Sequence, residues 1–161
     1  MASTTEIILA ASPITTEAFA PFGQVIVPST DGKPFGAADA QLVLQGTPRF
    51  YIMRLTGRGR RFHQITRHRH CTQCLGSLEG KTWLLGVAPP GPAAAPAQGA
   101  IQAFEIPGTC FVKLHVGTWH AGPYFDADVV DFYNLELSDT NVVDHDTCNL
   151  RAQYGVEFEM A

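Results

Sequence analysis

Residues that end or interrupt strands recur at short intervals along the whole chain. Between the Gly, Pro, Asp and Asn residues lie short segments rich in Val, Ile, Leu, Phe, Tyr and Trp. Segments of this length and composition are typical of β-strands separated by turns. The pattern predicts an all-β protein with strands over Gln24–Val27, Gln41–Leu44, Phe50–Leu55, Phe62–His70, Leu75–Leu78, Thr82–Ala88, Ile101–Ile106, Cys110–Val116 and Val129–Leu137.

One short helix is expected near the start of the chain, over Thr15–Ala20. Thr15 or Thr16 can cap its first turn, and Pro21 ends it because proline has no amide hydrogen to donate. The 161 residues are 45% hydrophobic, which suits one domain over residues 1–161 with a substantial core. Pro89–Ala100 is rich in Pro and Ala without periodicity and is expected to be a surface loop inside this domain.

Charge and hydropathy exclude several classes of partner. Only 16% of the residues are charged, the formal net charge is −4, and no block of like charge occurs, so neither nucleic acid nor an anionic membrane is an expected partner. The apolar runs are far shorter than the roughly 20 residues of a membrane-spanning helix. Because the first twelve residues contain no Lys or Arg, we expect a cytoplasmic protein, with the processed product of an organelle precursor as the alternative.

The four cysteines are too few for a disulfide scaffold and are expected to be thiols. Cys71 and Cys74 form a C-x-x-C pair, a spacing shared by zinc sites and redox centres. A structural zinc site usually has a second close pair, whereas Cys110 and Cys148 stand alone. The pattern therefore favours two strand or turn thiols, with a zinc or redox role as the open alternative.

Four of the six histidines form two tight groups, His68 with His70 and His115 with His120. In a strand, residues two apart point to the same face, so His68 and His70 are expected to project together while Arg67 and Arg69 point the other way. Many short strands suggest a sandwich, a jelly roll or a small barrel, whose interior is either filled by side chains or holds one small ligand. Imidazoles that converge inside such a barrel are suited to a divalent transition metal.

The spacing of these groups resembles the two cupin signatures. His68-Arg-His70-Cys-Thr-Gln73, separated from Gly80 by six residues, follows the first signature, except that Gln73 stands where cupins have Glu. Either His68 or His70 can take the second-histidine position. The segment from His115 to His120 is similar to the second signature. On the strand before it, alternation puts Lys113 and His115 on one face, where the cation can pair with an anionic substrate.

A more specific resemblance extends from about Ile14 to His145. The segments FGQVI, ITRHRHCTQ, WLLGVAPP, GTWHAGP, DFYNLEL and NVVDH are similar to those of the ureidoglycolate lyase family, especially its plant-type branch. The resemblance implies a cupin β-barrel (a double-stranded β-helix or jelly roll), a homodimer, and an enzyme that cleaves ureidoglycolate into glyoxylate and urea in purine and allantoin breakdown. The matching positions are His68, Gln73, His115 and His120, whereas His70 falls where bacterial members have an apolar residue.

These observations give a hypothesis for each candidate residue. The metal ligands are expected among His68, His70, Gln73 and His120; the catalytic residues are His115, His120 and Lys113; and the substrate is bound by Lys113, Gln73 and Tyr124. A base and an acid suffice for the reaction, because the substrate hydroxyl loses a proton while the departing urea nitrogen gains one. A bound metal would act as Lewis acid and template.

Two alternatives to the lyase are a cupin enzyme acting on another small hydroxy or keto acid and a noncatalytic ligand-binding cupin. Asp131, on an otherwise apolar strand, also has two interpretations, since its carboxylate can pair with an arginine such as Arg54 or orient a histidine.

Overall fold

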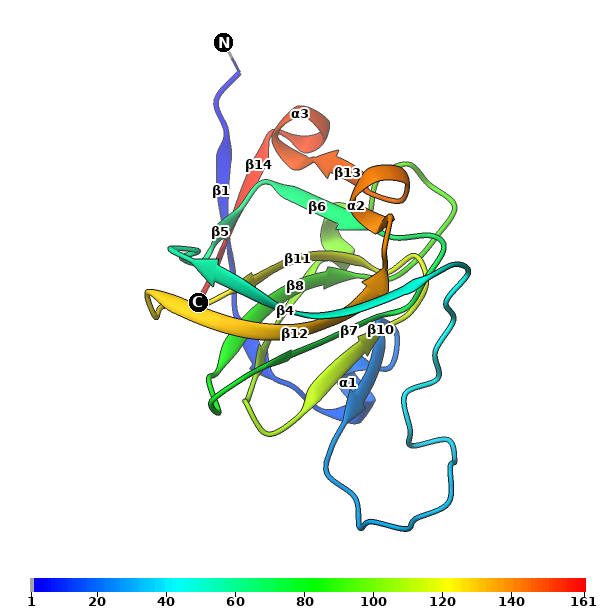
Figure 1. Ribbon diagram of the computed structural model, residues 1–161. Coiled ribbons are helices and arrows are strands. Elements are labelled where there is room, and N and C mark those ends of the chain that lie inside the picture. Colours follow the sequence, from blue (N-terminus) through cyan, green and yellow to red (C-terminus); the bar gives the residue numbers. More distant parts are fainter. Residues whose placement is uncertain (1) are drawn as a thin grey trace.

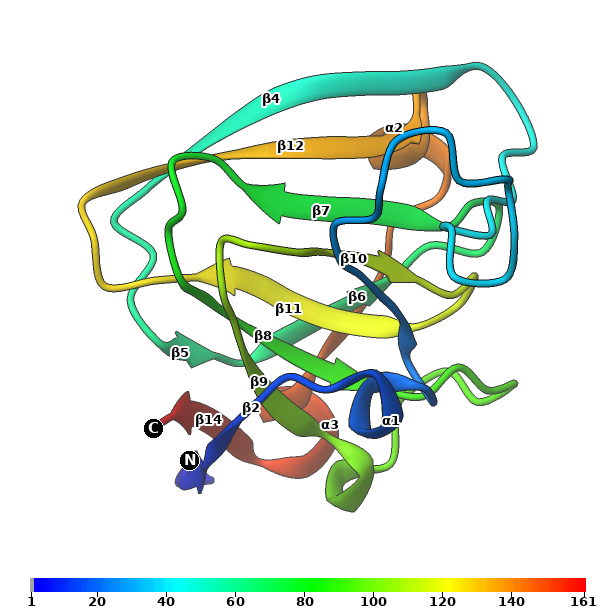
Figure 2. The same ribbon diagram turned by 90° about the horizontal axis from the view of Figure 1, so that it is seen from below.

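Two antiparallel sheets face each other and enclose the space in which the candidate site lies. A computed structural model describes residues 2–161. One sheet has the strand order β3-β10-β7-β12-β4 and the other has β13-β6-β11-β8-β9-β2, in which only the β2–β9 pair is parallel. Figure 2 shows the two layers, with β4, β12, β7 and β10 above β6, β11 and β8. The all-β prediction is confirmed, and the facing sheets have the arrangement of a cupin-type jelly roll.

The strands of the two facing sheets have the following bounds. The five-stranded sheet contains β3 (Gly23–Ile26), β4 (Pro48–Thr56), β7 (Gln73–Ser77), β10 (Phe111–Leu114) and β12 (Val129–Leu137). The six-stranded sheet contains β2 (Ala11–Pro13), β6 (Gln64–Arg67), β8 (Trp83–Ala88), β9 (Gln102–Ile106), β11 (Trp119–Tyr124) and β13 (Asp146–Asn149).

A third, smaller sheet covers the outside of the six-stranded sheet. It contains β1 (Thr5–Leu9), β14 (Val156–Met160) and β5 (Arg61–Phe62) in the order β1-β14-β5. Helix α3 (Leu150–Tyr154) leads into β14, and both termini lie on this side of the molecule (Figure 1). The chain thereby has two apolar cores, one between the facing sheets and one between the six-stranded sheet and this outer layer.

The inner core explains why the candidate site occupies only part of the enclosed space. Aromatic and aliphatic side chains fill the rest, among them Phe19, Trp83, Phe104 and Phe132, each at most 1% exposed. Phe19 belongs to α1 (Thr16–Phe19), which begins as expected because the Thr15 hydroxyl accepts a hydrogen bond from the Ala18 amide at 3.1 Å. Polar side chains that point inward are therefore gathered at one end of the barrel.

The strand expected over Phe62–His70 is interrupted twice. The chain changes partners at His63, because β5 pairs with β14 whereas β6 pairs with β11 and β13. It leaves the ladder again after Arg67, where the Asp144 carboxylate accepts hydrogen bonds from the amides of Arg69 and His70 at 2.7 and 2.9 Å. His68 and His70 consequently do not share a strand face, and that prediction is wrong.

Other differences follow from local hydrogen bonding. Gln41–Leu44 forms no strand beyond an isolated bridge from Leu44 to Cys71, because the Val43 amide donates to the Thr72 hydroxyl instead. Strand β11 contains Gly122 and Pro123, which resemble turn residues in the sequence, and its ladder is irregular between Ala121 and Tyr124. The sequence pattern did not predict β11, nor the strands β1, β2, β13 and β14, nor the short helices α2 (Thr140–Val143) and α3.

The expected surface loop is confirmed between β8 and β9. Apart from the short 3₁₀ helix η1 (Gln98–Ala100), residues 89–100 have no regular structure. The buried guanidinium of Arg67 anchors this loop by donating to the Gly91 carbonyl at 2.8 Å while it pairs with Asp146. Among residues 2–161, no helix is long and apolar enough to cross a membrane.

Candidate active site

A polar pocket of about 150 Å³ lies between the facing sheets at the end where α2 joins β13. The paired strands β6 and β11 of the six-stranded sheet form one wall of the pocket. Strands β4, β7 and β12 of the five-stranded sheet form the opposite wall. Its polar lining consists of Tyr51, Arg58, His68, Gln73, His120, Asn134, Glu136, Asn141 and His145. The two sheets therefore place imidazoles opposite a wall of amides and a carboxylate.

His68 enters the pocket because β6 alternates its side chains. Ile65 and Arg67 point to the outer core, so the next residue, His68, points inward, where it is 5% exposed. Its Nδ1 lies 2.6 Å from the Asp144 carbonyl oxygen. A carbonyl can only accept, so Nδ1 carries the hydrogen and the neutral ring has its lone pair on Nε2. Burial lowers the pKa of His68, opposed by this hydrogen bond and by the Asp144 and Glu136 carboxylates.

His120 reaches the same space from β11. Its neighbours Trp119 and Ala121 pack in the outer core, and His120 lies opposite Val87 of the inner core, with its ring centroid 5.0 Å from that of His68. Its Nδ1 lies 3.3 Å from the Thr118 carbonyl, which again leaves Nε2 as the lone-pair nitrogen. Burial, reinforced by His68, lowers the pKa of His120 to about 3. Both imidazoles are therefore neutral at neutral pH.

The opposite wall is a closed ring of four hydrogen-bonded side chains. Gln73 Nε2 donates to Asn134 Oδ1 at 3.0 Å and to Glu136 Oε2 at 3.5 Å. Asn134 Nδ2 donates to the Tyr51 hydroxyl at 3.2 Å, and that hydroxyl donates to Glu136 Oε1 at 3.2 Å. Gln73, Asn134 and Glu136 are each at most 6% exposed. The wall is thus buried and held by its own hydrogen bonds.

The Glu136 carboxylate sets the direction of every bond in this ring. A carboxylate only accepts, so both atoms that face it must donate, namely Gln73 Nε2 and the Tyr51 hydroxyl. Burial raises the pKa of Tyr51, which keeps that hydroxyl protonated. Because its single hydrogen is used on Glu136, the hydroxyl must accept from Asn134 Nδ2, and Asn134 Oδ1 then faces Gln73.

The ring leaves one buried atom of Gln73 without a partner. Gln73 Oε1 forms no hydrogen bond in the described part of the chain. Gln73 also lines, with His68 and His120, a narrow gap at the back of the pocket. Two imidazole Nε2 lone pairs and an orphaned amide oxygen fit a divalent transition metal, and each imidazole is oriented by a carbonyl at Nδ1. Over residues 2–161, no three His, Cys, Asp or Glu side chains converge to hold a metal ion.

Arg58 places a cation at the mouth of the pocket. It lies in the turn after β4 between Gly57 and Gly59, whose φ angles of 57° and 66° suit a tight left-handed turn. Arg58 Nε donates to the Pro123 carbonyl at 3.1 Å, and its guanidinium carbon is 5.1 Å from the centre of the Tyr124 ring. These contacts leave the two terminal nitrogens free of protein hydrogen bonds across the described residues.

The structure brings His68, Gln73 and His120 together and separates the other predicted site residues from them. The side chain of His70 is 55% exposed and lies with Arg69 and Asp146 on the outside. Tyr124 does not line the pocket; it stacks on Phe62 at 6.0 Å beside the outer core and supports Arg58.

Lys113 lies on the outer side of β10, and His115, the residue directly after that strand, lies on the same side. Their neighbours Val112 and Leu114 fill the inner core, so the face that Lys113 and His115 share is directed away from the pocket, against our expectation. The Lys113 ammonium is 3.1 Å from His115 Nδ1, and His115 Nε2 is 3.0 Å from the Ala20 carbonyl. Both ring nitrogens of His115 are thus engaged, although the residue borders the narrow gap behind Gln73.

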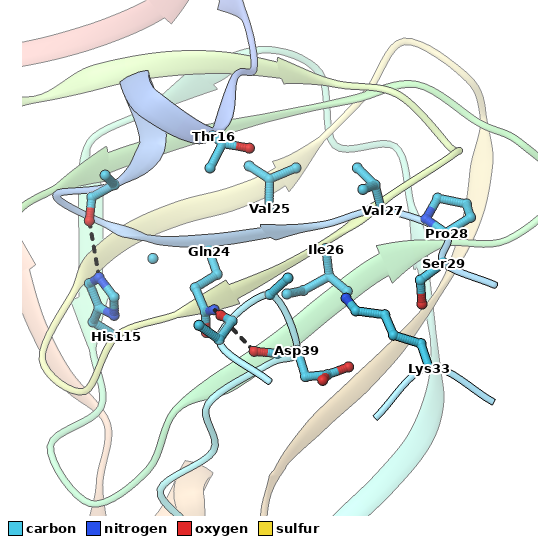
Figure 3. A pocket seen from close by; sticks show the side chains of 14 residues that line it. Thr16, Gln24, Val25, Ile26, Val27, Pro28, Ser29, Lys33, Asp39 and His115 are labelled. Carbon is cyan, nitrogen blue, oxygen red and sulfur yellow. Dashed lines mark hydrogen bonds between the residues drawn. The ribbon is translucent and has the colours of Figure 1, made fainter. Parts of the chain in front are cut away.

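His115 instead lines a larger, open cavity of about 480 Å³ beside β3 and α1, shown in Figure 3 with its hydrogen bond to the Ala20 carbonyl. This cavity has Gln24, Lys33 and Asp39 among its polar residues but lacks the paired imidazoles. We therefore take the smaller pocket as the candidate active site, since its chemistry rather than its size suits catalysis.

Several pocket residues were missed by the sequence analysis. Asn134 and Glu136 alternate with Tyr133 and Leu135 on β12, so their polarity at inward positions was a readable signal. Asp131, two residues earlier than Tyr133, points outward and pairs with Arg54 at 2.9 Å, which decides between its two interpretations. Asn141 and His145 lie in the NVVDH segment of the family resemblance but were given no role, and Tyr51 and Arg58 carried no pattern that marked them.

The structure also shows where the two thiols of the C-x-x-C pair, Cys71 and Cys74, lie. All four cysteines are free thiols, as expected. Cys71 is buried against Thr140, with its sulfur 3.8 Å from the hydroxyl oxygen, and Cys74 is buried opposite Lys113 on the outer face. Burial raises the pKa of the Cys71 thiol and raises that of Cys74 to about 11, so neither is an activated thiolate.

The fold and the imidazole-lined pocket define a cupin-type protein with a small polar candidate active site. Residues 6–157 match the ureidoglycolate lyase family, and the chain belongs to that family. It is therefore a lyase of the family that cleaves ureidoglycolate in purine catabolism.

Comparison with other proteins adds little beyond this assignment. Among curated proteins none is significantly similar. One similar solved structure is a dTDP sugar isomerase from Desulfovibrio desulfuricans G20, with 13% identity and a TM-score of 0.45 over 72% of this chain and 75% of that one.

The neutral state of His120 predicts a pH dependence of stability. Between the unfolded pKa of about 6.5 and the folded pKa of about 3, the unfolded chain binds more protons, so the free energy of unfolding falls as the pH falls through this range. In chelator-treated protein, His120→Gln should reduce this slope by roughly 1 kcal/mol per pH unit. Urea unfolding at several pH values measures it. His70→Gln, which removes an exposed imidazole, is the control, and parallel wild-type and His120→Gln curves would contradict the assignment.

Proposed function

We propose that this pocket cleaves ureidoglycolate into glyoxylate and urea with His68, Gln73 and His120 at its centre. The supporting observation is the pair of neutral imidazoles, 5.0 Å apart, whose Nε2 lone pairs are left free by the carbonyls at Nδ1. In this proposal the two Nε2 atoms and Gln73 Oε1 would hold a divalent metal, which supplies Lewis acidity toward the substrate hydroxyl when bound.

Arg58 takes the role that the sequence analysis gave to Lys113. Ureidoglycolate carries one carboxylate, and Arg58 is the cation that lines the pocket, with both terminal nitrogens available for a two-point contact. Lys113 is buried on the other side of the sheet, and burial lowers its pKa. Binding of the carboxylate at the mouth directs the rest of the substrate toward the imidazoles.

His145 takes the proton-shuttle role that was assigned to His115. It lines the pocket from the connection after α2, is exposed to solvent, and has its ring centroid 5.7 Å from that of His68. In the proposed reaction His145 accepts the hydroxyl proton, the carbon–nitrogen bond breaks as the carbonyl of glyoxylate forms, and the proton is delivered to the departing nitrogen of urea.

The activity prediction separates these residues from those outside the pocket. His120→Ala and His145→Ala should each lower the rate of glyoxylate formation about 100-fold or more, whereas His70→Ala should stay close to the wild type. The assay follows glyoxylate from ureidoglycolate above the spontaneous decay, with added divalent metal. Elemental analysis should find about one metal ion per wild-type chain and less in His120→Ala. Wild-type turnover no faster than the spontaneous reaction would refute the proposal.

The assignment of the carboxylate to Arg58 predicts an effect on substrate binding. Arg58→Gln should raise KM about tenfold or more because a charge-assisted, two-point contact is lost, with a smaller change in kcat. Arg54→Gln is the matched control, since Arg54 lies on β4 but points outward to Asp131. Steady-state kinetics of both variants measure this effect. An equal change of KM in the two variants would contradict the role of Arg58 in binding the substrate carboxylate.

We also propose that the chain forms a homodimer through the outer face of the five-stranded sheet. Phe50 and Ile52 are 70% and 63% exposed there on β4, the strand at the edge of that sheet, and the Phe50 ring lies 6.1 Å from that of Tyr133. Neighbouring apolar side chains of this size on an exposed sheet face favour association.

Light scattering coupled to size-exclusion chromatography tests the dimer. The wild type should have twice the 17.4 kDa mass of the chain, and Phe50→Asp should shift it toward the monomer because a charge would be buried at the interface. Phe35→Asp is the control, since Phe35 is 78% exposed on the loop between β3 and β4. A monomeric wild type, or a dimer unchanged by Phe50→Asp, would contradict the proposed interface.

A further inference from the structure

Glu136 is a buried carboxylate that the proposed reaction leaves unused. It is 2% exposed, lines the pocket from β12, and has no ion-pair partner among residues 2–161. Its two oxygens each accept one hydrogen bond, from the Tyr51 hydroxyl and from Gln73 Nε2, and the second of these is long at 3.5 Å. A carboxylate offers about four acceptor positions, so Glu136 can accept further hydrogen bonds.

The wall around Glu136 has almost no hydrogens left to donate. Both hydrogens of Gln73 Nε2 and the hydroxyl hydrogen of Tyr51 are used within the ring. Asn134 Nδ2 uses one hydrogen on Tyr51 and keeps one. A ligand that approaches this wall therefore meets several acceptors and a single donor. An occupant without N–H groups would leave a buried charge poorly solvated, which is costly.

From this pattern we infer that Glu136 is a specificity-determining residue that recognises the ureido end of the ligand. A ureido group is planar and presents N–H groups from two nitrogens on the same side, which matches the two oxygens of a carboxylate. This inference rests on the proposed function, and it adds the residue that recognises the ureido end and thereby rejects simple hydroxy or keto acids.

The charges of the pocket also fix the orientation of such a ligand. Arg58 is exposed at the mouth, whereas Glu136 is buried against the inner wall. The carboxylate of the ligand is attracted to the first and repelled by the second, so it stays at the mouth while the ureido group lies inside. The carbon between them then lies along the line from Arg58 to Glu136, beside the imidazoles that border the same pocket.

Binding of three unreactive acids tests the inference without relying on catalysis. N-carbamoylglycine has both ureido nitrogens, succinamate replaces the inner N–H by a methylene, and levulinate has no N–H group. Calorimetry on the wild-type holoprotein should rank their affinities in that order, with N-carbamoylglycine at least about tenfold tighter than levulinate because hydrogen bonds to a charged group are lost. Equal affinities for the three acids, or no binding of N-carbamoylglycine, would overturn the inference.

Glu136→Gln should reduce this discrimination to within about threefold while levulinate binds as before or more tightly. Asp131→Asn, on the same strand but on the outward face, is the matched control and should keep the wild-type order. Discrimination that persists in Glu136→Gln would overturn the role of Glu136. If that variant does not fold, the wild-type series decides alone.

The two proposals fail separately in this design. Glyoxylate release without discrimination among the acids would support the lyase reaction and contradict recognition of the ureido group by Glu136. Discrimination without glyoxylate release would support this recognition and contradict the lyase reaction.

Discussion

The arrangement of the active site depends on one buried negative charge. Glu136 can only accept hydrogen bonds, and this single restriction determines which way Gln73, Asn134 and Tyr51 are turned. It also leaves Gln73 Oε1 without a partner, which is the oxygen that completes the group with His68 and His120. Because these side chains are buried and polar, the neighbouring strands β4, β12 and β7 of the five-stranded sheet must be held in register for the ring to close.

On the imidazole side of the pocket, burial rather than charge determines the protonation state of the side chains. His68 and His120 are both removed from water, and burial is the main reason that their pKa values are low. Asp144 connects this wall to the backbone, since its carbonyl accepts from His68 and its carboxylate accepts from two amides just beyond β6. One residue therefore both ends the strand and fixes the tautomer of the imidazole that follows it, which no inspection of strand periodicity would reveal.

The sequence was sufficient for the class of fold and for part of the site. The segment rich in aliphatic and aromatic residues predicted β12 with its observed bounds, and every second residue of Val129–Leu137 packs into the interior. The signature spacing pointed to His68 and His120, and the structure places these two rings side by side because His68 directly follows β6, which pairs with β11. The prediction for His70 was wrong because the carboxylate of Asp144, some 75 residues away in the chain, accepts a hydrogen bond from the His70 amide and ends the strand before it. The prediction for Lys113 was wrong because alternation alone does not say which face of β10 is inside.

The residues that escaped prediction share one property, which is that their role depends on a partner from a distant segment. Arg58 becomes part of the pocket only because the Pro123 carbonyl and the Tyr124 ring hold it at the mouth. Glu136 is held in the wall of the pocket by hydrogen bonds from Tyr51 on the neighbouring strand and from Gln73. Together they give the pocket a positive mouth and a negative inner wall, with neutral imidazoles between them. A pocket with that sequence of charges discriminates against a symmetric diacid as well as against a simple hydroxy acid, because only a ligand with an anionic end and an N–H-bearing end satisfies both walls at once.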